Sequence, residues 1–238
     1  MKTNLSVAGL AVLALLGPDA DLRAATHEDG VALAIIYDTS GSMRDSVPDR
    51  AGKSAPKYVV ANRALQAIAN QVQAFATNAA SATTPHKIQT ALFVFNNGQA
   101  RAAIPLGPFD AAALQAWARS FSSPKGGTPL GNALRAAGQC VLNSSLSRKH
   151  VLVITDGLNT LGPSPETVMP DLQRQAARSQ ASLGVHFVAF DVDARQFEPL
   201  KKLGATVVGA GDEKQLNSQL EFILQRKILL EDEEPARK

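Results

Sequence analysis

Three short segments of the chain carry oxygen-bearing side chains at spacings that suit a metal ion. The first runs Asp38-Thr-Ser-Gly-Ser42 and directly follows the apolar run 31–37. The second delivers Thr128 after a pair of glycines, and the third ends an apolar run with Asp156. Two carboxylates and three hydroxyls are hard oxygen ligands, which suit Mg²⁺, or Mn²⁺ or Ca²⁺, rather than a thiophilic metal. The residue types therefore predict a divalent-metal site and favour binding as the function.

The spacing of the first segment has a physical reason. In a loop that leaves a buried parallel strand, alternate residues point the same way, so the side chains of Asp38, Ser40 and Ser42 converge. In an open parallel sheet, ligands bind beyond the carboxyl ends of the strands, where the strand order reverses. We therefore expect Thr128 and Asp156 to lie beside the first segment.

A simpler interpretation gives each of these side chains a local role. Asp38 would cap its loop, the two serines would hydrogen-bond nearby backbone, and the other two residues would do so at helix starts. Independent caps have no need to lie at the strand ends of one sheet. The joint pattern therefore favours the metal site.

With these residues, the chain resembles the von Willebrand factor type A (vWA) domains that carry a metal-ion-dependent adhesion site (MIDAS). The resemblance implies a Rossmann-like α/β fold: a doubly wound, mostly parallel six-stranded sheet in the order 3-2-1-4-5-6, with an antiparallel third strand and helices on both faces. It implies direct ligation by the hydroxyls and direct or water-mediated ligation by the carboxylates. It also implies a protein partner that presents Asp or Glu to the ion. The residues that match the family pattern are Asp38, Ser40, Ser42, Thr128 and Asp156.

The order of apolar and amphipathic segments fits an α/β fold. Strands that alternate with helices indicate a parallel, doubly wound sheet. Residues 44–57 are polar and are predicted to form a loop directly after the first metal segment. We expect strands at residues 31–37, 87–95, 99–105, 150–155, 185–190 and 206–208, and helices at 58–77, 110–121, 130–142, 165–182, 195–203 and 212–226.

Length and composition limit the possible functions. A chain of 238 residues that is 45% hydrophobic is long enough for one α/β domain with a large core. The net charge is +3, but acidic residues lie among the basic ones and no basic block is interleaved with aromatic residues. Nucleic acid is therefore not an expected partner.

The N-terminus predicts export. Residues 1–16 hold a short basic start and an apolar stretch of the length of a secretory signal, so we expect a signal peptide at 1–24, a vWA domain at 25–227 and a tail at 228–238. An ordinary N-terminal helix is the alternative, and no other segment is expected to cross a membrane. The only cysteine, Cys140, is expected to be a buried structural thiol, and a disulfide-free exported domain fits a bacterial periplasm or the extracellular space.

Two other functions compete with external partner binding. The same site would serve a subunit or assembly factor that docks inside a larger exported complex. A phosphoryl-transfer enzyme with Asp38 as nucleophile is the other, since haloacid-dehalogenase-like phosphatases place an Asp after their first strand. Those enzymes need a second Asp two residues later, and this chain has Ser40 there. A non-enzymatic binding protein is therefore the leading expectation.

Overall fold

The computed structural model describes residues 28–79, 87–96 and 98–230. The predicted signal peptide and residues 231–238 of the predicted tail lie outside this part of the chain. In the described part, no helix is both long and apolar enough to cross a membrane.

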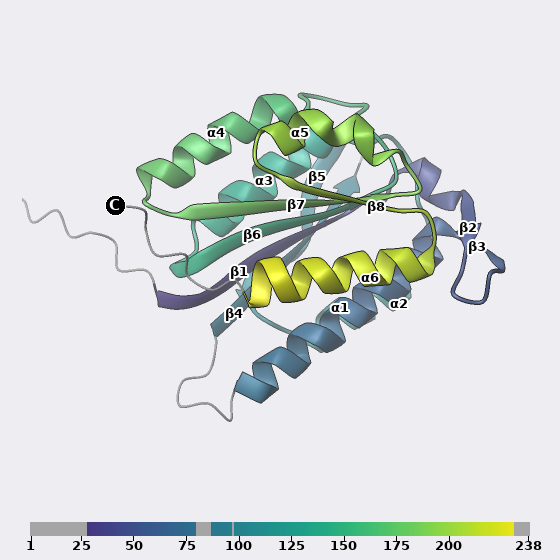
Figure 1. The fold of residues 1–238 in the computed structure, drawn as a ribbon, viewed down its shortest axis with the longest axis horizontal. Coiled ribbons are helices and arrows are strands. Elements are labelled where there is room, and N and C mark those ends of the chain that lie inside the picture. Colours follow the sequence, from purple (N-terminus) through teal and green to yellow (C-terminus); the bar gives the residue numbers. More distant parts are fainter. Residues whose placement is uncertain (1–27, 80–86, 97, 231–238) are drawn as a thin grey trace, which may run out of the picture.

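A six-stranded sheet forms the centre of the molecule, in the order β5-β4-β1-β6-β7-β8 (Figure 1). Only β5 runs antiparallel to its neighbour, and the other neighbouring strands are parallel. In chain order this is 3-2-1-4-5-6, so the predicted fold class, strand order and antiparallel third strand are confirmed. The strands are β1 (Glu28–Tyr37), β4 (Lys87–Asn96), β5 (Gln99–Pro108), β6 (Leu146–Thr155), β7 (Ser182–Phe190) and β8 (Thr206–Ala210).

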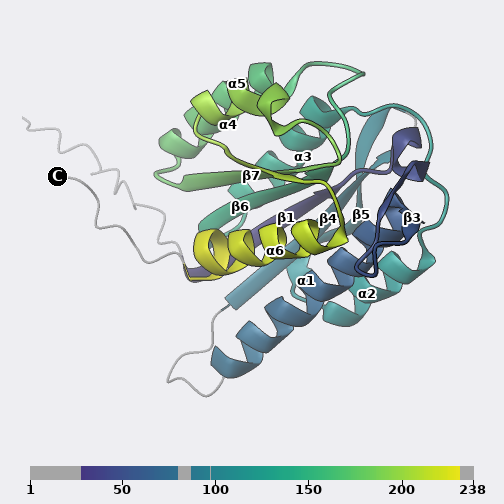
Figure 2. The ribbon, with the colours of Figure 1, turned by 45° about the vertical axis from the view of Figure 1, so that its right-hand side comes forward.

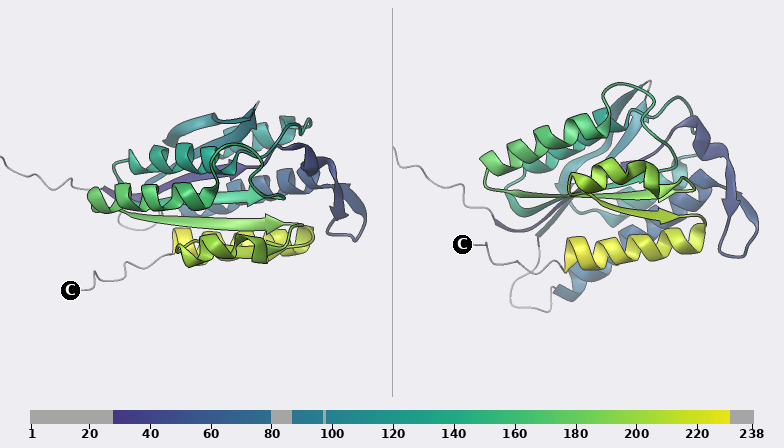
Figure 3. Two further views of the ribbon diagram at one scale, coloured as in Figure 1. Left: turned by 90° about the horizontal axis from the view of Figure 1, so that it is seen from above. Right: turned by 45° about the horizontal axis from the view of Figure 1, so that its top comes forward.

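Helices cover both faces of this sheet (Figure 3), and each face has its own apolar core. Alternate residues of β1 point to opposite faces: Leu33 and Ile35 pack on one core, and Ala34 and Ile36 on the other. All four are fully buried, as expected of a central parallel strand. On the first face lie α1 (Lys57–Ala79), α2 (Ala111–Ser120) and α6 (Glu213–Ile223), and on the second α3 (Leu130–Leu142), α4 (Pro165–Arg178), the 3₁₀ turn η2 (Ala194–Phe197) and α5 (Glu198–Lys202).

Residues 44–57, predicted as a polar loop, contain a small antiparallel hairpin instead. Its strands are β2 (Ser46–Pro48) and β3 (Ser54–Pro56). The hairpin projects from the body of the molecule at the right of Figure 1 and is turned toward the viewer in Figure 2. Val47 pairs with Ala55, and both side chains are buried in the core. Three residues are too short a strand for alternation to reveal it in the sequence.

The last α-helix, α6, is extended by a segment of π-helix. After α6 the chain continues as a π-helical segment, η3 (Leu224–Leu229), in which Ile228 and Leu229 are buried. Arg148 on β6 donates a hydrogen bond to the carbonyl oxygen of Leu229 at 3.2 Å. The described chain is therefore packed against the sheet almost to its last residue.

An aromatic cluster closes the core beside the end of β1. Trp117 of α2 meets Tyr37 edge to face, with ring centroids 5.1 Å apart, and stacks on Phe121 at 5.2 Å. The Tyr37 hydroxyl donates a hydrogen bond to Asn62 Oδ1 at 2.7 Å. These contacts fix the last residue of β1, and hence the starting point of the segment that follows it.

Candidate metal site

Asp38 leaves the end of β1 and is fully buried. Its backbone N–H donates to the carbonyl oxygen of Ile154 at 3.0 Å, which extends the β1–β6 pairing by one residue. One carboxylate oxygen accepts a hydrogen bond from the Thr155 hydroxyl at 2.6 Å, and the other accepts from the Ser40 N–H at 2.8 Å. Asp38 is thus held in one orientation by the neighbouring strand and by its own loop.

Ser40 directly precedes a short 3₁₀ helix, η1 (Gly41–Arg44), which contains Ser42 and which Met43 anchors in the core. The hydroxyl oxygens of Ser40 and Ser42 lie 3.1 Å apart. Ser42 donates to Asp156 Oδ1 at 2.9 Å, across 114 residues of sequence. The first and third predicted segments therefore meet through a direct side-chain contact.

The Thr128 loop is fastened to the first segment by backbone hydrogen bonds. The N–H of Gly41 donates to the carbonyl oxygen of Gly126 at 2.9 Å, and the N–H of Lys125 donates to that of Thr39 at 2.8 Å. Gly126 has φ +80°, a conformation that favours glycine. The loop that delivers Thr128 therefore lies directly against the segment that carries the serines.

Thr128 itself is buried and lies beside the third segment. Its N–H donates to the Thr160 hydroxyl at 2.7 Å, and its carbonyl oxygen accepts from the Thr160 N–H at 2.9 Å. A Cβ placed on Gly157 would lie 3.9 Å from Thr128 Oγ1 and 4.0 Å from Ser42 Oγ. The hydroxyls of both residues thus flank one backbone position, and the structure brings all three predicted segments together at one edge of the sheet.

The charge distribution at this edge favours a cation. Burial, and next the nearby charge of Asp156, raise the pKa of Asp38 to about 6, against the lowering effect of hydrogen bonds from Ser40 and Thr155. Two ionised carboxylates held close together in a buried place repel each other, and a nearby positive charge or a bound proton offsets this repulsion. The site therefore has both oxygen donors and a need for positive charge.

Lys57 supplies a positive charge at this edge of the sheet, and this role was not predicted from the sequence. Its side chain is buried, and its ammonium lies 3.1 Å from Asp156 Oδ2 and 2.9 Å from Asp191 Oδ2. Burial lowers the pKa of Lys57, but the hydrogen bonds and charges of the two aspartates outweigh this effect and raise it. No sequence signal marks this lysine, because the pairing arises only when the start of α1 meets the ends of β6 and β7.

The donor set fits a hard divalent ion in its chemistry. Within the described ranges, no group of three or more His, Cys, Asp and Glu side chains is arranged to hold a metal. The predicted site has only two carboxylates and depends on hydroxyl oxygens, which are ligands for Mg²⁺, Mn²⁺ or Ca²⁺ and poor ones for soft metals. The residues present therefore fit such an ion.

Cys140 and the histidines lie away from this site. Cys140 on α3 is half-buried, and burial raises the pKa of its thiol, so it is not a reactive thiolate. His150 and His186, on neighbouring strands, are buried with ring nitrogens 3.2 Å apart. Neither residue contributes to the carboxylate and hydroxyl cluster.

Sequence comparison identifies one family. Residues 33–159 match the family model described as von Willebrand factor type A domain, which is more than half of the 238 residues. The matched segment begins in β1 and ends just beyond Asp156, so it includes all three site segments. A comparison with curated protein sequences finds no match.

Solved structures share this fold at low sequence identity. The PilB minor pilin from Streptococcus sanguinis has a TM-score of 0.61 at 14% identity, over 82% of this chain and 60% of the pilin. Proximal thread matrix protein 1 from the mussel byssus, in a structure with a zinc-occupied MIDAS motif, has a TM-score of 0.58 at 14% identity, over 84% of this chain and 48% of the mussel protein. The vWF domain of the type V pili tip protein Mfa5 from Porphyromonas gingivalis has a TM-score of 0.56 at 13% identity, over 83% of this chain and 94% of that domain.

These likenesses concern the fold, because the identities are low. The chain spans about 60% of the length of the pilin and about half of the mussel protein. The matched family model, the strand order and the antiparallel edge strand all lead to the same assignment. The chain belongs to the von Willebrand factor type A domain family.

Proposed function

We propose that the chain binds a divalent cation, Mg²⁺ or in its place Mn²⁺ or Ca²⁺, and through it an Asp or Glu side chain of a protein partner. The observation that carries this proposal is the contact of Ser42 with both Ser40 and Asp156, which joins donors from two distant segments. The proposed ligand set is that of an intact MIDAS. It consists of Asp38, Ser40, Ser42, Thr128 and Asp156.

Among the chain's own proposed ligands, only two carboxylates would carry a negative charge. The hydroxyls of Ser40, Ser42 and Thr128 would hold it without neutralising it, and the two aspartates would act directly or through water. Thr155 and the Ser40 N–H keep the Asp38 carboxylate oriented. An ion held in this way accepts a further carboxylate, which a partner would provide.

The contact surface would extend beyond the ion. Leu158 and Leu161, in the loop after Asp156, are exposed large apolar residues, with 42% and 41% of their surface accessible. A Cβ on Gly127 would lie 2.8 Å from the Leu161 side chain, so Leu161 lies against the Thr128 loop. These apolar side chains at the rim support a protein partner over a free small anion.

Export is part of the proposal. Residues 1–24 would be removed as a signal peptide, and residues 25–227 would act as the vWA domain in a bacterial periplasm or outside the cell, with 228–238 as a tail. Support comes from the N-terminal sequence and from the fold shared with pilus proteins. The same likeness favours, as a second candidate, a subunit or assembly factor that docks inside a larger exported complex.

We further propose that the chain is not an enzyme. A phosphoryl-transfer reaction at Asp38 would need an acid at the position of Ser40, whose hydroxyl instead lies 3.1 Å from that of Ser42. A serine hydroxyl does not protonate a leaving group at neutral pH as a carboxylic acid with a raised pKa does.

Calorimetric titration of the full chain with Mg²⁺ and Mn²⁺ tests the metal site. We expect saturable binding that is lost in Asp38→Ala and in Thr128→Ala. Asp171→Ala and Thr77→Ala are matched controls, because both residues are exposed on helices away from the site. Binding that survives in the Asp38 and Thr128 variants would rule out this ligand set.

Selection from a displayed peptide library tests the partner chemistry. In Mg²⁺, we expect the parent chain to enrich peptides that contain Asp or Glu, and the enrichment to disappear with a chelator or in Asp38→Ala. Equal enrichment with and without the metal would contradict a role for the ion in partner binding.

A further inference from the structure

Lys57 lies directly behind the proposed metal site and is 5% exposed. It is the first residue of α1, and its backbone N–H donates to the carbonyl oxygen of Asp45 at 2.8 Å. Its ammonium joins two carboxylates that follow neighbouring strands, Asp156 after β6 and Asp191 after β7. A buried lysine in contact with a proposed metal ligand is a fixed positive charge close to the ion's position.

The two oxygens of Asp156 face different partners. Oδ1 accepts a hydrogen bond from Ser42, whereas Oδ2 contacts the Lys57 ammonium. The side chain of Asp156 is completely buried, so solvent screens this ion pair little. Lys57 therefore shares one carboxylate with the proposed metal site and leaves the oxygen on the Ser42 side to that site.

A charge count shows the consequence. Asp38 and Asp156 together carry two negative charges when ionised, and the buried Lys57 compensates one of them. The side chain of Asp191, the other partner of Lys57, is 43% exposed, so solvent screens its charge more strongly. The buried part of the site thus presents about one net negative charge to a divalent cation.

We propose that Lys57 weakens cation binding at this site, so that the bound ion keeps surplus positive charge for the carboxylate of the partner. This inference rests on the proposed function. It adds that Lys57 determines how strongly binding of the cation depends on the partner's carboxylate. A unit charge a few ångströms from a divalent ion changes the affinity by about tenfold or more, even with strong dielectric screening. Removal of the Lys57 charge should therefore tighten metal binding.

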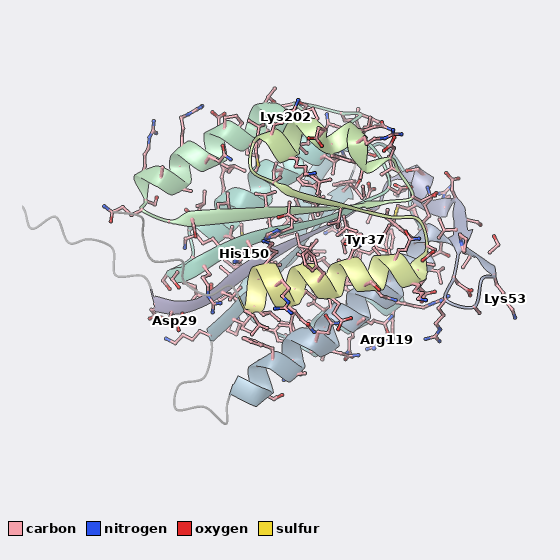
Figure 4. All side chains as sticks on the ribbon, viewed as in Figure 1. Asp29, Tyr37, Lys53, Arg119, His150 and Lys202 are labelled. Atoms are coloured by element: carbon pink, nitrogen blue, oxygen red, sulfur yellow. The ribbon has the colours of Figure 1, made fainter. Side chains whose placement is uncertain are left out.

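A purely structural role for Lys57 makes a different prediction. If the lysine only fastens α1 to the ends of β6 and β7, its replacement would lower stability without any gain in metal affinity. Lys57→Gln keeps an N–H donor for Asp156 but removes the charge, and Lys57→Met removes both. Lys53→Met is the matched control for charge, because Lys53 lies at the exposed tip of the hairpin (Figure 4).

The test is calorimetric titration of the full chain with Mn²⁺ and Mg²⁺, in the parent, the two Lys57 variants, Lys53→Met, and Asp38→Ala both alone and combined with each Lys57 variant. We expect Lys57→Gln and Lys57→Met to bind the ions about tenfold more tightly than the parent, and Lys53→Met to match the parent. Binding that appears only in the Lys57 variants and is lost on adding Asp38→Ala would support the inference equally.

The remaining outcomes separate two kinds of failure. Equal or weaker affinity in the Lys57 variants, with binding in the parent that Asp38→Ala abolishes, would overturn the inference and leave the proposed function in place. Loss of the fold in both Lys57 variants would also overturn it, because the lysine would then serve the fold. If neither the parent nor the Lys57 variants bind an ion, or if Asp38→Ala binds as well as the parent, the proposed function itself fails.

Discussion

The carboxyl end and the amino half of the central strands both bury titratable groups, but the groups at the two ends have different partners. Beyond the carboxyl ends, Asp38 and Asp156 lie within a network of hydroxyls and a lysine. Nearer the amino ends, His150 and His186 stack on each other inside the sheet's helical cover. The two carboxylates thus have hydrogen-bond donors and a cation beside them, whereas the two imidazoles face each other. Lys149, beside His150, is also fully buried, and its ammonium donates to the backbone carbonyl oxygens of Ser144 and Leu146.

The pKa shifts of the two regions express this difference. Burial raises the pKa of Asp38 to about 6 and lowers those of His150 and His186 to about 3 and about 4. Each shift favours the neutral form, but the carboxyl end also has hydroxyl oxygens beside its carboxylates, and one of the residues that provide them, Ser42, is exposed to solvent. The same sheet therefore carries the proposed metal site at one end and a pair of neutral histidines toward the other.

The largest expected effect concerns the histidine pair. Below about pH 6.5 both histidines become protonated in the unfolded chain, whereas in the folded chain they stay neutral to a lower pH. The stability that the neutral pair contributes is therefore present at neutral pH and is lost as the pH falls. We expect the free energy of unfolding of the parent, relative to a His150→Leu/His186→Leu variant, to fall by on the order of 4 kcal/mol between pH 7 and pH 4.5. Urea unfolding at both values measures it, and an identical pH dependence in the two proteins would contradict it.

The next effect concerns the proposed metal site at the carboxyl end. Because the folded pKa of Asp38 is about 6, an ion must displace a proton from this carboxyl in more acidic solution. We expect the affinity for Mn²⁺ to be nearly constant above pH 7 and to fall about tenfold per pH unit below pH 6. Calorimetry at pH 7.5 and pH 5.0 measures the difference, and unchanged affinity would show that Asp38 does not have to lose a proton.

The smallest expected effect is a gain in stability, with a loss of metal binding, when the charge of Asp38 is removed. A raised folded pKa means that Asp38 contributes stability when protonated and loses it as the pH rises through about 6. In the metal-free protein at pH 7, Asp38→Asn should therefore raise the free energy of unfolding by about 1 kcal/mol, while metal no longer stabilises the variant. Thermal unfolding with and without Mg²⁺ tests both parts. A destabilised Asn variant would show that the carboxylate contributes more as a hydrogen-bond acceptor than it costs by its charge.

The fold was predictable because its signals are local. Most of the parallel strands contain an apolar run long enough to recognise, and the Asp38 segment begins where such a run ends. The resemblance to vWA domains then supplied the strand order, which the structure confirms. By contrast, Val47 and Ala55 form the one buried apolar pair among the three residue pairs of the β2–β3 hairpin, so no periodic pattern marked it.

The surroundings of the site were less predictable than its ligands. Lys57 ends a polar stretch and looks like a solvated charge until the ends of β6 and β7 are placed beside it. Thr155 looks like the last residue of an apolar strand, yet its hydroxyl orients Asp38. Both roles arise from contacts between residues about 100 or more positions apart, which a single sequence does not encode in any local pattern.

The aromatic cluster beside the end of β1 has a practical consequence. Trp117 is the only tryptophan of the chain, and its ring lies 5.1 Å from that of Tyr37, the residue immediately before Asp38. Its fluorescence is therefore a natural optical probe of this end of the sheet, free of background from any second tryptophan. A shift in its emission when an ion or a partner is added would report events at the site in real time, without a dye or a label.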